Sequence, residues 1–134
     1  MEEKIIKDKI QIAFNKLLAN DQYLLKADAN ERSITHKLAE YLQTEFSDWN
    51  VDCEYNRNGM NIKRLMSFKM DITSDDTDAT SVFPDIIIHH RGTDENLAVI
   101  EAKKSSNELG NDKEKLKAYK MDLNYKFAIK ITLP

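Results

Sequence analysis

Two neighbouring apolar segments constrain the fold of this chain more than any other feature of its sequence. Residues 82–90, VFPDIIIHH, and residues 96–103, NLAVIEAK, each run as a nearly continuous row of aliphatic side chains. Only the turn-like residues 91–95, RGTDE, separate them, so we expect an antiparallel β-hairpin. Strands that are apolar on both faces are typical of a sheet that is covered on each side. The hairpin therefore predicts a sheet enclosed by helices.

Periodic segments elsewhere in the sequence supply candidates for those covering layers. Residues 2–19 and residues 31–46 repeat apolar side chains at three- and four-residue steps, which predicts two helices. A short strand is expected over residues 51–55, a further helix over residues 108–122 and a last strand over residues 125–133. This order of elements predicts the α/β class, with a mixed sheet between helices.

The stretch between the first strand and the hairpin permits more than one interpretation. Residues 60–70 mix basic and apolar side chains and fit either a helix or a strand, whereas residues 71–81 are rich in Asp, Ser and Thr and predict a loop. Arg57 and Lys63 belong to a locally basic run with interleaved Met and Phe. Such a run either contacts a nucleic acid or forms a solvated face beside a small apolar cluster.

Length and composition narrow the class of protein. The 134 residues fit one domain, 1–134, with a single core. A net charge of -3 argues against strong non-specific binding to DNA, but it is compatible with a site where metal ions supply the positive charge. One cysteine excludes an internal disulfide, and no apolar run approaches the roughly 18 residues that span a membrane. The N-terminus lacks the apolar stretch of a signal peptide. We expect a cytoplasmic protein with no membrane partner.

The hairpin also predicts where the chemistry lies. With the turn centred on Thr93, Asp85 faces Glu101 across the two strands. Cross-strand neighbours have Cβ atoms about 5 Å apart on one face of a sheet. Side chains alternate along a strand, so Lys103 shares the face of Glu101. A shift by one residue would put the two carboxylates on opposite faces, so this prediction depends on the register.

Two carboxylates this close among aliphatic side chains are unfavourable unless something compensates their charge. A divalent cation is the usual compensation, and carboxylate oxygens suit Mg²⁺ or Mn²⁺. Lys103 adds a positive charge, and its ammonium could orient or activate an attacking water. The plainer alternative is a cross-strand ion pair near the end of the sheet, because a Glu-x-Lys triplet alone is weak evidence.

The sequence Pro84-Asp85, followed later by Glu101-Ala102-Lys103, resembles the signature of the PD-(D/E)XK nuclease superfamily. That superfamily has the restriction-endonuclease-like fold, whose core is helix, three strands, helix and strand (αβββαβ). The segments expected over residues 31–133 follow this order, which leaves residues 1–20 as an extra N-terminal helix. The resemblance implies an enzyme that depends on Mg²⁺ or Mn²⁺ and hydrolyses phosphodiester bonds. We expect DNA as the substrate, although the sequence itself does not separate DNA from RNA.

The resemblance also implies roles for individual residues. Asp85 and Glu101 look like the two metal-binding carboxylates. Lys103 looks like the catalytic lysine that positions the nucleophilic water. Glu31 is similar to the acidic residue that many members place on the first core helix as a further metal ligand. The carbonyl of Ala102 would be another metal ligand in such sites.

Candidates for contact with the substrate are Arg57, Lys63, Lys115 and Tyr119. Tyr119, with Lys115 four residues before it, lies where some members of the superfamily have Gln-x-x-x-Tyr on the second core helix. Lys115 departs from that pattern, which puts a substrate role there in doubt.

Two further hypotheses stay open beside an active nuclease. A catalytically inactive member of the superfamily would bind nucleic acid or protein without hydrolysing either. An interaction module in which the N-terminal helix forms a homodimer is compatible with an active nuclease, and light scattering decides the oligomeric state. The chain could also work with a separate partner subunit.

Overall fold

The computed structural model describes residues 2–26, 31–54, 57–58, 61–62, 64–65, 80–81, 84–104 and 112–134, and everything below concerns this part of the chain. For a few of these residues, Glu31 and Arg57 among them, only the backbone is described. The elements in chain order are α1 (Glu3–Asn20), α2 (Gln22–Lys26), α3 (Glu31–Glu45), β1 (Asn50–Cys53), β2 (Arg57–Asn58), β3 (Asn61–Ile62), β4 (Arg64–Leu65), β5 (Thr80–Ser81), β6 (Ile86–His89), β7 (Asn96–Lys104), α4 (Asp112–Leu123) and β8 (Phe127–Leu133).

Four strands form one mixed sheet in the order β1-β6-β7-β8. β6 pairs antiparallel with both β1 and β7, whereas β7 and β8 run parallel. A parallel pair needs a crossover connection, and α4 lies between β7 and β8 in the chain. The α/β class, the mixed sheet and the order of its elements are therefore confirmed.

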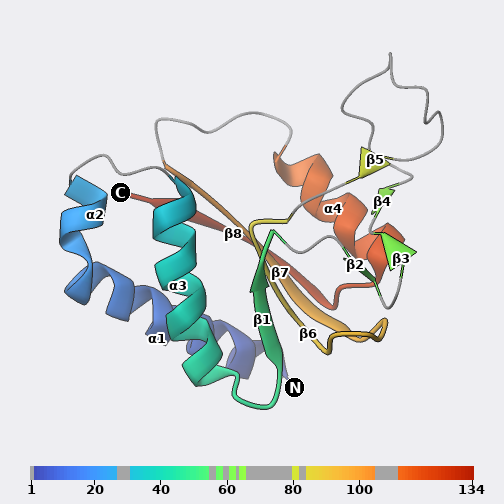
Figure 1. Cartoon of the computed structure of the whole chain (residues 1–134), viewed down its shortest axis with the longest axis horizontal. Coiled ribbons are helices and arrows are strands. Elements are labelled where there is room, and N and C mark those ends of the chain that lie inside the picture. Colours follow the sequence, from blue (N-terminus) through green and yellow to red (C-terminus); the bar gives the residue numbers. More distant parts are fainter. Residues whose placement is uncertain are drawn as a thin grey trace.

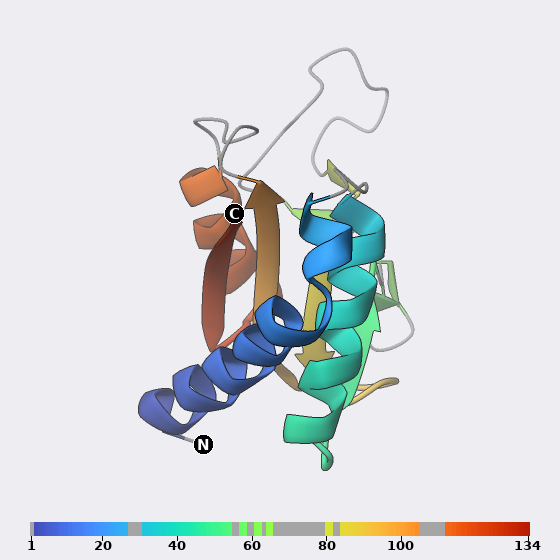
Figure 2. The same cartoon turned by 90° about the vertical axis from the view of Figure 1, so that its left-hand side faces the viewer.

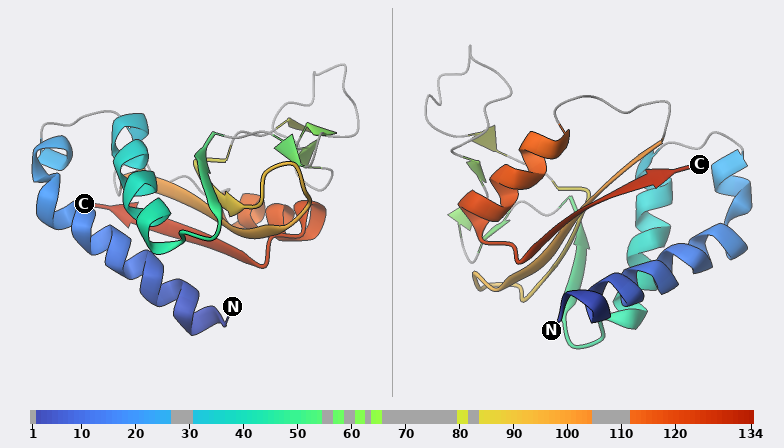
Figure 3. Two further views of the ribbon diagram at one scale, coloured as in Figure 1. Left: turned by 60° about the horizontal axis from the view of Figure 1, so that its bottom comes forward. Right: turned by 180° about the vertical axis from the view of Figure 1, so that it is seen from behind.

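Helices cover both faces of this sheet, as the apolar hairpin predicts. α1 and α3 pack on one face and α4 on the other (Figures 1 and 2). Alternation along β6 divides its side chains between the two layers. Ile86 and Ile88 are buried in the larger core with α1 and α3, and Ile87 is buried in the smaller core with α4. The view from behind in Figure 3 shows α4 beside β8.

The hairpin strand that was expected over residues 82–90 is shorter in the structure and begins at Ile86. Pro84 has no N–H to donate to a neighbouring strand, and Asp85 uses its side chain rather than its backbone to reach β7. This correction places Asp85 just before the strand, at the end of the sheet.

Other differences lie at the ends of elements. The helix α2 was not predicted, and β8 begins at Phe127 rather than at residue 125. Short antiparallel pairs, β2 with β3 and β4 with β5, occur between the first strand and the hairpin. β3 and β4 lie within residues 60–70, which the sequence left between helix and strand, whereas β5 lies at the end of residues 71–81, which were expected to form a loop. The start of the fourth helix, expected at residue 108, lies outside the described residues. Within the described ranges, no helix combines the length and apolar character needed to cross a membrane.

Candidate active site

The register of the hairpin is the predicted one. Ile86 pairs with Ile100, so the next position outward brings Asp85 opposite Glu101. The ladder between β6 and β7 is irregular only beyond Ile88, towards the turn and away from the two acids. The condition on which the candidate site depended is therefore met.

Asp85 is fixed by hydrogen bonds from both neighbouring strands. Its Oδ2 accepts a hydrogen bond of 2.9 Å from the backbone N–H of Ala102, in the part of β7 that extends past β6. Its carbonyl oxygen accepts one of 3.1 Å from the backbone N–H of Glu54. The side chain of Asp85 thus accepts from β7 a hydrogen bond that a backbone carbonyl would accept in a regular ladder. Asp85 remains half-buried.

Glu101 is the buried member of the pair. Tyr119 of α4 donates a hydrogen bond of 3.0 Å to Glu101 Oε1, and the Nζ of Lys115 lies 3.3 Å from the same oxygen. Burial and the neighbouring charge and hydrogen bond of Asp85 raise the pKa of Glu101 to about 8, although Lys115 and Tyr119 act in the opposite direction. Glu101 therefore holds a proton at neutral pH.

Lys103 lies on the same face as Glu101, as alternation predicts, because both follow Val99 of the α4-facing core at two-residue steps. It is half-buried and makes no hydrogen bond or ion pair with other described residues. The sequence therefore predicted the face on which Lys103 lies. It did not predict that Lys115, rather than Lys103, forms the ion pair with Glu101.

Lys115 and Tyr119 were predicted only as substrate contacts. The structure places both against Glu101, one helical turn apart on the face of α4 that packs on the sheet. The i, i+4 spacing and the apolar positions of that helix were the available signal, since residues four apart share one face. Burial raises the pKa of Tyr119 well above its ordinary range, and the charge of Glu101 adds to this, so Tyr119 serves as a donor.

Three other predicted residues cannot be placed at this site. Glu31 begins α3, but its side chain lies outside the described part of the structure, as does the side chain of Arg57. Lys63 lies outside the described residues altogether. The first turn of α3 does approach this end of the sheet, because Arg32 Nε lies 3.1 Å from Glu54 Oε1 and Glu54 bonds to the backbone of Asp85.

The donor set of the site suits a hard cation. The carboxyls of Asp85 and Glu101 lie side by side, and a proton on Glu101 reduces their repulsion. A divalent ion could replace that proton. Among the described side chains, no group of three or more His, Cys, Asp or Glu residues lies close enough to hold a metal ion. Asp85 and Glu101 would therefore need water or backbone oxygens to complete a coordination shell.

A second cluster on the same side of the sheet was missed by the sequence analysis. Asp52 Oδ2 accepts hydrogen bonds from His89 Nε2 at 2.7 Å and from Arg91 Nε at 2.9 Å, and a terminal nitrogen of Arg91 contacts Asp52 Oδ1. Burial opposes the charge of Asp52, but the hydrogen bonds and charges of Arg91 and His89 hold its pKa below the ordinary value. His89, at the end of β6, is almost completely buried.

Comparison with protein-family models, with curated proteins and with solved structures finds no match to this chain. A functional assignment must therefore be argued from the geometry and chemistry of the site.

Proposed function

We propose that this chain is a metal-dependent nuclease with a restriction-endonuclease-like fold, and that it hydrolyses phosphodiester bonds in DNA. The observation that supports this most directly is the pairing of Asp85 with Glu101 at the end of a central hairpin. Burial, together with the neighbouring carboxyl of Asp85, raises the pKa of Glu101 to about 8, although Lys115 acts in the opposite direction. Buried groups with strongly shifted pKa values are characteristic of functional sites.

The arrangement of elements supports the same proposal. From α3 onward the sheet is built from a helix, three strands, a helix and a strand, which is the αβββαβ order of that fold. The two carboxylates and Lys103 lie at the positions of its sequence signature. Glu31 and the carbonyl of Ala102 are the further ligands that we propose for the cation.

Asp85 and Glu101 would hold Mg²⁺ or Mn²⁺, which when bound supplies Lewis-acid stabilisation of the charge that develops on phosphate. The hydrogen bond from Ala102 fixes one of these carboxylates, and Tyr119 fixes the other. Both are thus oriented before a ligand arrives, which favours catalysis because little reorganisation is needed.

Lys103 is the group that we assign to water and phosphate. It lies two residues beyond Glu101 on the same face, roughly 7 Å along the strand. Its ammonium would orient an attacking water and stabilise negative charge on a phosphate oxygen.

The test is cleavage of supercoiled plasmid, single-stranded DNA and RNA by the purified chain with Mg²⁺ or Mn²⁺, and with a chelator instead. We expect DNA cleavage that requires the ion and that falls about a hundredfold or more in Lys103→Met. Lys126→Met is the matched control, because Lys126 bonds through its backbone to Asn96 at the opposite end of β7. Cleavage that persists in the chelator, or that is unaffected by Lys103→Met, contradicts the proposal.

One observation favours a second candidate function, a nuclease-like domain that binds nucleic acid or protein without hydrolysis. Glu101 is buried and already has two partners from α4, as in a purely structural ion pair. Isothermal titration calorimetry with Mg²⁺ separates the two functions. DNA binding without any binding of Mg²⁺ would support the inactive domain.

A further inference from the structure

Lys115 is the side chain that already neutralises part of the candidate metal site. Its Nζ lies 3.3 Å from Glu101 Oε1 and 5.9 Å from the centre of the Tyr119 ring. A position beside a carboxylate oxygen and over an aromatic face is suited to a cation. Tyr119 donates its hydrogen bond to the same oxygen, so Oε1 of Glu101 has two partners from α4.

The two members of this ion pair differ in exposure. The side chain of Lys115 is 22% exposed, whereas that of Glu101 is 3% exposed. The ammonium therefore lies on the solvent side of a carboxylate that is otherwise enclosed. A lysine has a flexible four-carbon stem, so its ammonium can withdraw without movement of the helix.

We infer that the Lys115 ammonium stands in for a divalent cation beside Glu101 and is displaced when such a cation binds. Two cations beside one carboxylate repel each other, and this repulsion is stronger inside a protein than in water, so each weakens the binding of the other. Lys115 thus competes with the ion and sets the ion concentration at which the site fills. This inference rests on the proposed function and adds a regulation of the same site.

The experiment compares the affinity for Mg²⁺ of the wild type, Lys115→Met and Lys115→Arg by isothermal titration calorimetry without nucleic acid. Loss of the competing charge should tighten binding about tenfold in Lys115→Met, whereas Lys115→Arg keeps the charge and should not bind more tightly. The measurement is made at pH 8.5, above the pKa of about 8 of Glu101, so that a bound proton does not mask the effect.

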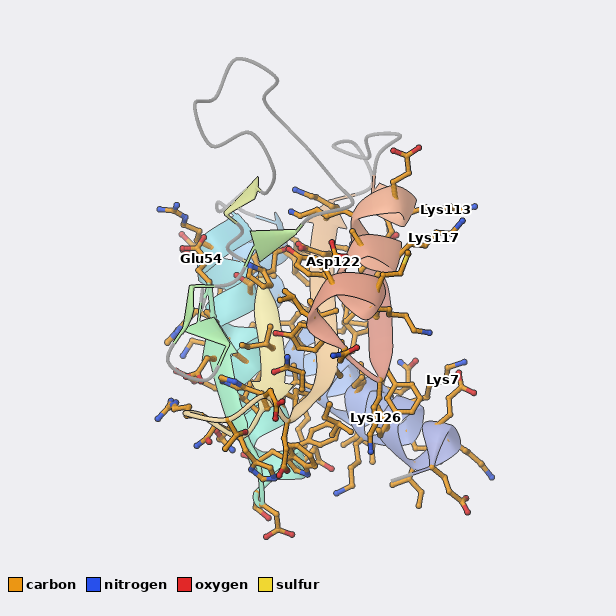
Figure 4. All side chains as sticks on the ribbon, turned by 90° about the vertical axis from the view of Figure 1, so that its right-hand side faces the viewer. Lys7, Glu54, Lys113, Lys117, Asp122 and Lys126 are labelled. Carbon is orange, nitrogen blue, oxygen red and sulfur yellow. The ribbon has the colours of Figure 1, made fainter. Side chains whose placement is uncertain are left out.

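Lys117→Met is the matched control, because it removes the same charge from the same helix. Lys117 is exposed on the outer side of α4 (Figure 4). At an ionic strength of 0.15 M its charge is screened over about 8 Å, so the affinity for Mg²⁺ should stay that of the wild type. Circular dichroism establishes that each variant is folded.

Equal or weaker binding by folded Lys115→Met overturns the inference and leaves the proposed function standing. If the wild type binds no Mg²⁺, the proposed function fails and the inference fails with it. A second measurement uses the unaltered chain: amine labelling with mass spectrometry should find Lys115 several-fold more reactive with Mg²⁺ than without, and Lys117 unchanged. A Lys115 reactivity that Mg²⁺ does not change also overturns the inference.

Discussion

Two clusters of charged side chains lie on the α4-facing side of the sheet, and their charges are balanced differently. In one, a single carboxylate, that of Asp52, receives hydrogen bonds from Arg91 and His89. In the other, the ammonium of Lys115 contacts Glu101, and the carboxyl of Asp85 lies beside the same residue. The pKa of Asp52 is lowered and the pKa of Glu101 is raised, so the same type of group responds in opposite directions.

The difference teaches how to separate a structural ion pair from a functional site. The Asp52 cluster is satisfied by its own side chains, and removing either partner would leave a buried charge uncompensated. In the Asp85–Glu101 cluster, burial and the neighbouring carboxyl of Asp85 raise the pKa of Glu101. Two adjacent carboxyls with little access to water are unfavourable for stability, and this is the arrangement expected where a cation completes the site.

The largest expected contrast is in catalysis. Asp85→Asn should lower metal-dependent DNA cleavage about a thousandfold, because a carbonyl oxygen cannot supply the charge that binds the ion. Asp52→Asn, the matched change in the balanced cluster, should alter the rate by less than about threefold at a temperature where it is folded. Single-turnover cleavage rates measure both. A comparable loss in Asp52→Asn would erase the distinction between the clusters.

The next contrast is in the pH dependence of stability. The native state keeps a proton on Glu101 up to about pH 8, whereas the unfolded chain releases it near its ordinary pKa of 4.5. The native state therefore binds more protons in this window, and the free energy of unfolding should fall by about 3 kcal/mol between pH 5 and pH 8. Urea unfolding in the presence of a chelator measures this fall. It should disappear in Glu101→Gln, and its persistence there would show that another group is responsible.

Asp52 should contribute a pH dependence of stability that has the opposite sign to that of Glu101. Because its folded pKa lies below the ordinary value, the stabilisation is present above that value and is lost as the pH falls through the folded pKa. We expect Asp52→Asn to lower the free energy of unfolding by about 2 kcal/mol at pH 7, and by less in acid. Urea unfolding of the two proteins at pH 7 and pH 3 is the measurement. A variant as stable as the wild type at pH 7 would contradict the structural role.

The smallest effect concerns the hydrogen bond that orients Glu101. Tyr119→Phe removes the donor to Oε1 and should lower the free energy of unfolding by about 1 kcal/mol at pH 8. Tyr23→Phe is the control, because Tyr23 is 81% exposed, and it should change stability very little. Equal effects of the two substitutions in thermal unfolding would mean that the hydroxyl of Tyr119 does not stabilise the site.

Local regularities explain how much of this was predictable. Alternation and the short turn placed Asp85 opposite Glu101 and put Lys103 on the same face, because a strand has a strict two-residue period. Apolar periodicity gave the helices, and apolar strands on both faces gave the covering layers.

The remaining features depend on contacts between segments far apart in the chain. The partnership of Lys115 with Glu101 depends on how α4 crosses the sheet, which no period in either segment encodes. The Asp52 cluster joins two strands whose pairing was not predicted, so His89 and Arg91 gave no signal of their shared partner. β6 begins at Ile86 rather than at residue 82 because Pro84 lacks an N–H for strand pairing. The apolar pattern alone did not predict this start.

The irregular step in the ladder beyond Ile88 has a consequence for how this hairpin can vary. It lies between the turn and the acidic pair, so the strands are already out of regular step on the turn side. A change in the length of residues 91–95 can therefore be absorbed at the irregularity without rotating Asp85 away from Glu101. The turn of this hairpin can therefore change in length while Asp85 stays opposite Glu101.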